Sequence, residues 1–172
     1  GGILFIDEAH HLYKPDNERD YGSEAIELLL QVMENQRDDL ILIFAGGKAK
    51  IDGFFDSNPG ISSRIGNHVD FKDYDSKDLI DITKYLLTNE NRYKYTPDSI
   101  AILQHYIDQL KTFPAFANAR TLKVLVNQLL AFQAIRVEDT LAKKGSIDYD
   151  SLVTIRPEDC NYFTPDDFIN II

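Results

Sequence analysis

The stretch Gly2-Ile3-Leu4-Phe5-Ile6-Asp7-Glu8 decides the fold of this chain. Four consecutive apolar residues followed at once by two carboxylates predict a strand that is buried on both faces of a parallel sheet. Open parallel sheets bind their ligands beyond the carboxyl ends of the strands, so Asp7 and Glu8 would lie at a ligand-binding edge. The pattern alone is equally compatible with a surface Asp-Glu pair at the end of a strand.

The residues after this stretch predict an α/β arrangement. A second apolar run, residues 40–45, predicts a neighbouring strand, and residues 23–36 between the two runs predict a helix whose apolar face carries Ile26, Leu29, Leu30 and Met33. A further crossover containing Phe54 and Phe55 ends at Asn58-Pro59-Gly60. We expect a third short strand at residues 68–71.

From Asp75 onward the apolar spacing is helical throughout. Three runs show it: Leu79, Ile82 and Leu86; Ile100, Leu103, Ile107 and Leu110; Leu122, Leu125, Leu129 and Phe132. Thr96-Pro97 and Thr164-Pro165 each predict a helix start, because Thr caps helices and Pro suits their first position. The sequence therefore predicts two domains, an α/β domain at residues 1–74 and an α-helical domain at residues 75–172.

Composition excludes several classes of function. The chain has 172 residues and a formal net charge of -10. Binding to nucleic acid is disfavoured, because it depends on cationic side chains that displace counterions from phosphates. The single cysteine, Cys160, allows neither an internal disulfide nor a cysteine-based zinc site. No apolar run approaches the roughly 20 residues that cross a bilayer, so no membrane partner is expected.

The residues that follow Asp7-Glu8 carry a more specific signal. They include Leu12-Tyr13, the run from Asn17 to Gly22, and the run from Leu29 to Asn35. With Ser57-Asn58-Pro59-Gly60, Ser63-Arg64-Ile65 and Asp73-Tyr74, the first part of the chain closely resembles the Walker B half of the red-type rubisco activase (CbbX) family of AAA+ ATPases.

This resemblance implies the second half of an AAA+ P-loop core, a parallel sheet with flanking helices, followed by an α-helical lid. It implies ATP and Mg²⁺ as cofactors, with Asp7 binding the magnesium ion and Glu8 activating water. Arg64 matches the arginine finger that reaches the nucleotide of a neighbouring subunit in a homo-hexamer. Arg120, in Phe116-Ala117-Asn118-Ala119-Arg120, matches the sensor-2 arginine that contacts the phosphates. On pattern alone, Arg64 would pair with a nearby acid and Arg120 would be a helix-surface residue.

The family also implies a function. Its members are ATP-driven rings that pull on the rubisco large subunit and release inhibitory sugar phosphates, in the bacterial cytoplasm or the plastid stroma. Two alternatives stay open: a related AAA+ remodeller of a secretion or sporulation system, and a non-catalytic module of ring assembly.

The sequence departs from the family pattern in three places. The Walker A loop is absent from these residues, so we expect that an N-terminal segment is missing and that this chain alone does not hydrolyse ATP. Gly47 stands where the family usually has Tyr, which leaves no candidate for sensor 1. Ser62 stands where an Arg often precedes the finger.

Two other motifs point to different chemistry. Asp7-Glu8-Ala9-His10 spells the signature of a helicase group, but the acidic composition and the lack of a Gln-x-x-Gly-Arg-x-Gly-Arg segment disfavour unwinding. His10 and His11 raise the possibility of a metal site. Because adjacent side chains are expected to point apart, and His68 and His105 are remote in sequence, we do not expect zinc.

Overall fold

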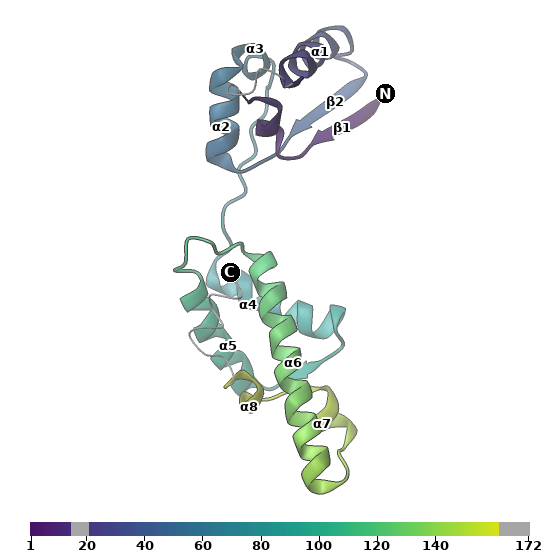
Figure 1. Cartoon of the computed structure of the whole chain (residues 1–172), viewed down its shortest axis with the longest axis vertical. Helices are drawn as coiled ribbons and strands as arrows, with labels where there is room; N and C mark the ends of the chain where they lie inside the picture. The colour runs from purple at the N-terminus through teal and green to yellow at the C-terminus, as the bar shows by residue number, and fades with distance from the viewer. Residues whose placement is uncertain (15–20, 162–172) are drawn as a thin grey trace. The chain divides into compact units, whose positions relative to one another are not determined.

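A computed structural model describes residues 1–14 and 21–161 of the chain (Figure 1). It divides the protein into two compact units, Gly1–Phe71 and Lys72–Ile172. Part of the expected activase-like run, Asn17 to Asp20, and the expected helix start at Thr164-Pro165 lie outside the described residues. No helix within the described ranges is long and apolar enough to cross a membrane.

The first unit is built on two parallel strands. β1 (Gly2–Ile6) pairs with β2 (Leu40–Phe44), with Ile3 opposite Ile41 and Ile6 opposite Phe44. The crossover between them contains the short 3₁₀ helix η1 (Ala9–Leu12) and the helix α1 (Gly22–Asn35); α2 (Lys48–Ser57) and α3 (Pro59–Ser62) follow β2. Figure 1 shows α1, α2 and α3 on one side of the two strands. The first two predicted strands, the helix between them and the α/β class are confirmed.

The helices cover one face of this two-stranded sheet. Along β2, half-buried Leu40, Leu42 and Phe44 alternate with Ile41 and Ile43, which are exposed. The covered face packs on a small core of Ile26, Phe54 and Ile61. The expectation that both strands are buried on both faces is therefore wrong for this chain: Phe5 of β1 is 58% exposed, because no described element lies over the second face.

The third strand expected at residues 68–71 does not form. This segment lies outside any strand, and Val69 and Phe71 are largely exposed. A strand is stabilised by a hydrogen-bonded ladder and by cross-strand contacts. In the described part of the first unit, β1 and β2 pair only with each other, so residues 68–71 have no ladder partner.

The second unit is helical, as predicted. It contains α4 (Ser76–Tyr85) running into the π-helical turn η2 (Leu86–Glu90), then α5 (Pro97–Leu110), the long α6 (Ala119–Lys144), α7 (Tyr149–Val153) and α8 (Pro157–Cys160). Two short strands, β3 (Lys94–Tyr95) and β4 (Thr154–Ile155), pair in parallel. The predicted cap is present: Thr96 Oγ1 accepts the N–H of Ser99 at 3.2 Å.

One apolar core holds these helices together. The predicted helical faces converge in it, and their central residues are almost fully buried: Leu79, Leu86, Leu103, Ile107, Leu110, Leu122, Leu125 and Leu129. Three further predicted residues, Ile82, Ile100 and Phe132, pack at its margin.

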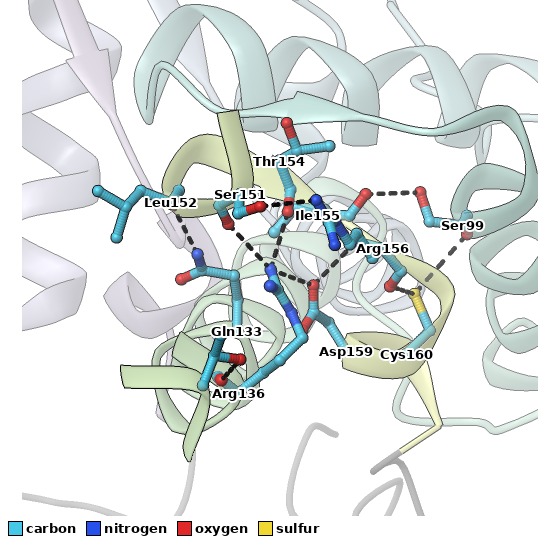
Figure 2. Close-up of polar contacts among 11 residues, drawn as sticks. Ser99, Gln133, Arg136, Ser151, Leu152, Thr154, Ile155, Arg156, Asp159 and Cys160 are labelled. Atoms are coloured by element: carbon cyan, nitrogen blue, oxygen red, sulfur yellow. Dashed lines mark hydrogen bonds and ion pairs between the residues drawn. The ribbon is translucent and has the colours of Figure 1, made fainter. Parts of the chain in front are cut away.

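A buried ion pair attaches the last described segment to α6. The guanidinium of Arg136 donates to the carboxylate of Asp159 and, at 3.0 Å, to the carbonyl of Thr154 (Figure 2). Asp159 is completely buried, and its Oδ2 also accepts the N–H of Arg156 at 2.8 Å, which caps α8. Gln133 adds a bond to the carbonyl of Leu152 at 2.7 Å. These contacts hold α7, β4 and α8 against α6.

The ion pair gives a prediction for stability. In Arg136→Met the Asp159 carboxylate stays buried without its partner, so the helical unit should lose about 3 kcal/mol or more of unfolding free energy. Urea unfolding followed by far-UV circular dichroism measures this loss. Lys143→Met, which removes an exposed cation from the same helix, is the control, with an expected change within about 0.5 kcal/mol. Equal midpoints for the two variants would show that the pair does not stabilise the unit.

Cys160 gives a prediction for reactivity. Burial, together with the neighbouring charge of Asp159, raises the pKa of the Cys160 thiol to about 12. At pH 8 the reactive thiolate should therefore be about one part in ten thousand of the thiol. We expect no colour change with a disulfide reagent at pH 8 in the native protein and one reacting thiol per chain in denaturant. Rapid labelling of the native protein would contradict the burial of this side chain.

Candidate functional site

The acidic pair lies at the carboxyl end of β1. The ladder between the strands continues past β1 and β2: Ala45 donates to the carbonyl of Ile6 at 2.9 Å, and Ala9 donates to the carbonyl of Ala45 at 2.9 Å. Asp7 and Glu8 are the two residues between these anchored positions, and both are exposed. The sheet thus presents two adjacent carboxylates at the edge where parallel sheets bind ligands.

Glu8 has an unusual backbone conformation. Its φ of 47° and ψ of 44° lie in the left-handed region, which costs a non-glycine residue free energy and is concentrated at functional sites. The N–H of Glu8 donates to Oδ1 of Asp7 at 3.0 Å, and the carbonyl of Glu8 accepts the N–H of His11 at 2.9 Å. These bonds, with the anchored Ala9, hold the sharp turn by which the chain leaves β1 and enters η1.

Glu8 lies beside two histidines. Nδ1 of His10 is 3.2 Å from Oε2 of Glu8, and the rings of His10 and His11 lie with their centroids 4.2 Å apart. The expectation that the two adjacent histidines point apart, without a third ligand close by, is therefore wrong. It assumed an extended or regular helical backbone, whereas the left-handed Glu8 and the tight 3₁₀ turn bring the three side chains together.

Small residues follow β2 at this edge. Ala45, Gly46 and Gly47 come directly after the strand, so none of these three positions supplies a polar side chain. Gly46 is needed for packing, because a Cβ at this position would lie 2.9 Å from Cγ1 of Ile51 and 3.5 Å from Nδ1 of His10. A residue with a Cβ would therefore displace the Ile51 side chain, and its Cβ would be in van der Waals contact with His10.

Arg64 follows α3 in the same unit and is held in place by two partners. Its Nη2 and Nε donate to Oε2 of Glu34 on α1, at 2.9 and 3.3 Å, and its Nη1 donates to the carbonyl of Gly60 at 2.9 Å. The side chain is 40% exposed and borders a groove of about 690 Å³ that is also lined by Leu42 and Asn67. Arg64 thus pairs with an acid, as the pattern alone indicated, and still presents part of its guanidinium to solvent.

Arg120 lies in the helical unit, on the exposed side of the first turn of α6.

The residue before this helix, Asn118, has a role that the sequence did not reveal. Asn118 Nδ2 donates to Oδ1 of Asp73 at 2.7 Å, and Asn118 Oδ1 accepts the N–H of Tyr74 at 3.1 Å. Asn118 therefore ties the start of α6 to the segment that leads into α4. The one sequence signal for this conformation is the residue type, because Asn tolerates a positive φ better than most residues, and Asn118 has a φ of 50°.

The two carboxylates are the kind of ligand that a magnesium nucleotide requires. Mg²⁺ binds oxygen atoms and usually keeps several waters, so a single exposed carboxylate such as that of Asp7 is enough from the protein. Glu8, one residue further, offers a second exposed carboxylate. The His10 and His11 nitrogens are not ligands of the kind that Mg²⁺ selects.

Comparison with known proteins defines the class. A family model described as an AAA lid domain matches residues 75–167. With two parallel strands, the first of which ends in an acidic pair, and a helical lid after them, the chain belongs to the AAA+ ATPases, as the second half of the core and the lid.

The relatives carry CfxQ, CbbX and rubisco activase names, which are those of the family that the sequence resembles. The chain is 52% identical over 159 residues to the CfxQ homologue of Guillardia theta and to the chloroplastic ribulose bisphosphate carboxylase/oxygenase activase of Cyanidioschyzon merolae, and 47% identical to CbbX of Cereibacter sphaeroides. Each match covers 92% of this chain and 53%, 53% and 50% of the relative, respectively. The chain spans about half the length of these proteins. The resemblance to the CbbX family is thereby confirmed.

The conformation of Asn118 gives a prediction. Its φ of 50° and ψ of -125° suit glycine, so Asn118→Ala should lose the side-chain bonds and also strain the backbone, whereas Asn118→Gly loses only the bonds. We expect Asn118→Ala to be the less stable variant by about 1 kcal/mol, measured by urea unfolding. Equal unfolding free energies of the two variants would show that α6 can begin with a different backbone conformation at residue 118.

Proposed function

We propose that this chain is the Walker B half and lid of a ring-forming AAA+ ATPase that remodels rubisco and releases inhibitory sugar phosphates from it. The observation that carries the ATPase part is the Asp7-Glu8 pair, anchored by the strand ladder at the carboxyl end of β1 with Glu8 in the left-handed conformation. The proposal concerns a protein of the relatives' full length, about half of which this chain spans.

Asp7 and Glu8 have different roles in this proposal. Asp7 would hold the magnesium ion through its carboxylate, and Glu8 would orient a water and accept its proton. The ion would supply positive charge that neutralises the phosphates of the nucleotide. The turn at Glu8 keeps both carboxylates exposed beyond the strand, which is what separate contacts to an ion and a water require.

Arg64 and Arg120 supply cations in the proposal. Arg64 acts on the nucleotide of the neighbouring subunit in a homo-oligomer, which we take to be a hexamer. Its partner Glu34 positions the guanidinium, since the two bonds to Oε2 limit its rotation. Arg120, at the exposed start of α6, contacts the phosphates from the lid, so that movement of the lid follows hydrolysis.

The protein substrate is inferred from the relatives' names. One of them is named a ribulose bisphosphate carboxylase/oxygenase activase and is chloroplastic, so the large subunit of rubisco is the proposed partner, in plastid stroma or bacterial cytoplasm. A secretion or sporulation remodeller and a non-catalytic assembly module remain the alternatives.

The first test is ATP hydrolysis by the full-length protein with and without inhibited red-type rubisco. Glu8→Gln should lower the rate by about a hundredfold or more while nucleotide binding persists, because the amide cannot accept a proton. Glu27→Gln, an exposed glutamate on α1, is the matched control and should hydrolyse ATP normally.

The outcomes separate the three alternatives. Glu8-dependent hydrolysis together with recovery of rubisco activity supports the full proposal. Glu8-dependent hydrolysis without recovery assigns the ATPase to another protein substrate. Absence of hydrolysis in the folded full-length protein leaves the assembly module.

A second test concerns Arg64. Arg64→Ala should reduce hydrolysis by about a thousandfold, the scale of an arginine finger. Mixing Arg64→Ala with Glu8→Gln subunits should restore part of the activity, since an interface can then combine an intact Glu8 with an intact Arg64 from its neighbour.

Glu34→Gln is the control for this second test. If Arg64 only forms an ion pair within its own subunit, Glu34→Gln and Arg64→Ala should impair hydrolysis equally, and mixing should restore nothing.

A further inference from the structure

Three side chains form a compact group in the first unit, and two of them have no part in the proposed ATPase mechanism. Glu8, His10 and His11 each offer a ligand atom, and these atoms all lie within 4.8 Å of one another. Of the three, only Glu8 has a part in the proposed hydrolysis. The two imidazoles beside it therefore have no function assigned so far.

The backbone brings these three side chains together. Glu8 and His11 are three residues apart across the first turn of the 3₁₀ helix η1, where side chains at that spacing lie above one another. The N–H of His11 donates to the carbonyl of Glu8 at 2.9 Å, which closes this turn. The left-handed φ of Glu8 then turns its carboxylate toward His10.

His10 supplies the fixed part of the group. Its side chain is only 15% exposed, and Nδ1 is buried without a hydrogen-bond partner in the described structure. Oε2 of Glu8 lies 3.2 Å from this nitrogen, but without the geometry of a hydrogen bond. A ring nitrogen and a carboxylate oxygen that face each other in this way can both bind one cation placed between them.

We propose that Glu8, His10 and His11 form a binding site for a divalent transition-metal ion of the zinc type. Two imidazole nitrogens and one carboxylate oxygen, with water in the remaining position, are a common donor set for zinc. The ligand atoms must approach to about 2.0–2.2 Å from the ion. Glu8 and His11 are exposed and can rotate toward it, while His10 stays in place. Nitrogen donors disfavour Mg²⁺, so the site is distinct in selectivity from that of the nucleotide's magnesium.

The site would link metal binding to hydrolysis. This consequence rests on the proposed role of Glu8 as the group that accepts the proton of water. A carboxylate that coordinates zinc is no longer available as a base. Zinc should therefore inhibit ATP hydrolysis without displacing the nucleotide.

The experiment measures zinc binding directly. The full-length protein, purified without a histidine tag, is titrated with ZnCl₂ in a calorimeter, and with CoCl₂ while the visible absorption of tetrahedral cobalt is recorded. We expect one ion per chain in excess Mg²⁺. His11→Gln, at an exposed position that does not threaten folding, should weaken zinc binding by about tenfold or more, because even residues outside the ligand shell have effects of that size.

Two further variants complete the test. His10→Gln should weaken zinc binding similarly, with circular dichroism used to verify its fold. His105→Gln, an exposed histidine on α5, is the matched control and should bind zinc like the parent protein. The proposal is overturned if the protein binds no zinc, or if His11→Gln and His10→Gln bind it as tightly as His105→Gln does.

Hydrolysis in the presence of zinc separates this proposal from the function proposed above. Inhibition by micromolar ZnCl₂ that is lost in His11→Gln supports both. Zinc binding that depends on both histidines but leaves hydrolysis unchanged supports the metal site and contradicts the role of Glu8 as base. Hydrolysis that depends on Glu8, in a protein that binds no zinc, supports the role of Glu8 as base and contradicts the metal site.

Discussion

The hydrogen bonds that extend the β1–β2 ladder beyond the strands are the constraint on which the candidate site depends. The N–H of Ala45 donates to the carbonyl of Ile6, and the carbonyl of Ala45 accepts the N–H of Ala9. The two residues between Ile6 and Ala9 must therefore complete a sharp turn. That turn places Glu8 in a left-handed conformation and leaves Asp7 and Glu8 exposed at the sheet edge. The same turn starts the 3₁₀ helix that places His10 and His11 beside Glu8.

The two units are stabilised in different ways. The helical unit has a continuous apolar core, closed by the buried pair of Arg136 and Asp159. In the first unit, the described helices cover one face of a two-stranded sheet and leave Ile3, Phe5 and Ile41 exposed on the other. Within the described residues, the lid is therefore the better packed of the two, and the site residues Asp7, Glu8 and Arg64 lie in the less packed unit.

Much of the fold could be predicted because it follows from local patterns. The runs at residues 3–6 and 40–45 are too apolar for loops, and the helical spacing from Leu79 to Phe132 allows few other structures. The expected strand at residues 68–71 failed because a strand depends on a partner that the local sequence does not reveal. The same limit explains the exposed side chains of β1, since burial on a second face requires an element to cover it.

The sequence by itself determined the acidic pair at the end of an apolar strand and the helical second domain, including the cap of α5 at Thr96. These features depend on residue types at short spacing, whereas the class of the protein followed from the resemblance to a known family. Only the tertiary structure decided that Glu34 holds Arg64, that Asn118 holds Asp73 and Tyr74, and that Glu8 meets His10 and His11. The first two contacts join residues that are distant in the chain, and the third depends on one left-handed residue, whose conformation the spacing of side chains cannot specify.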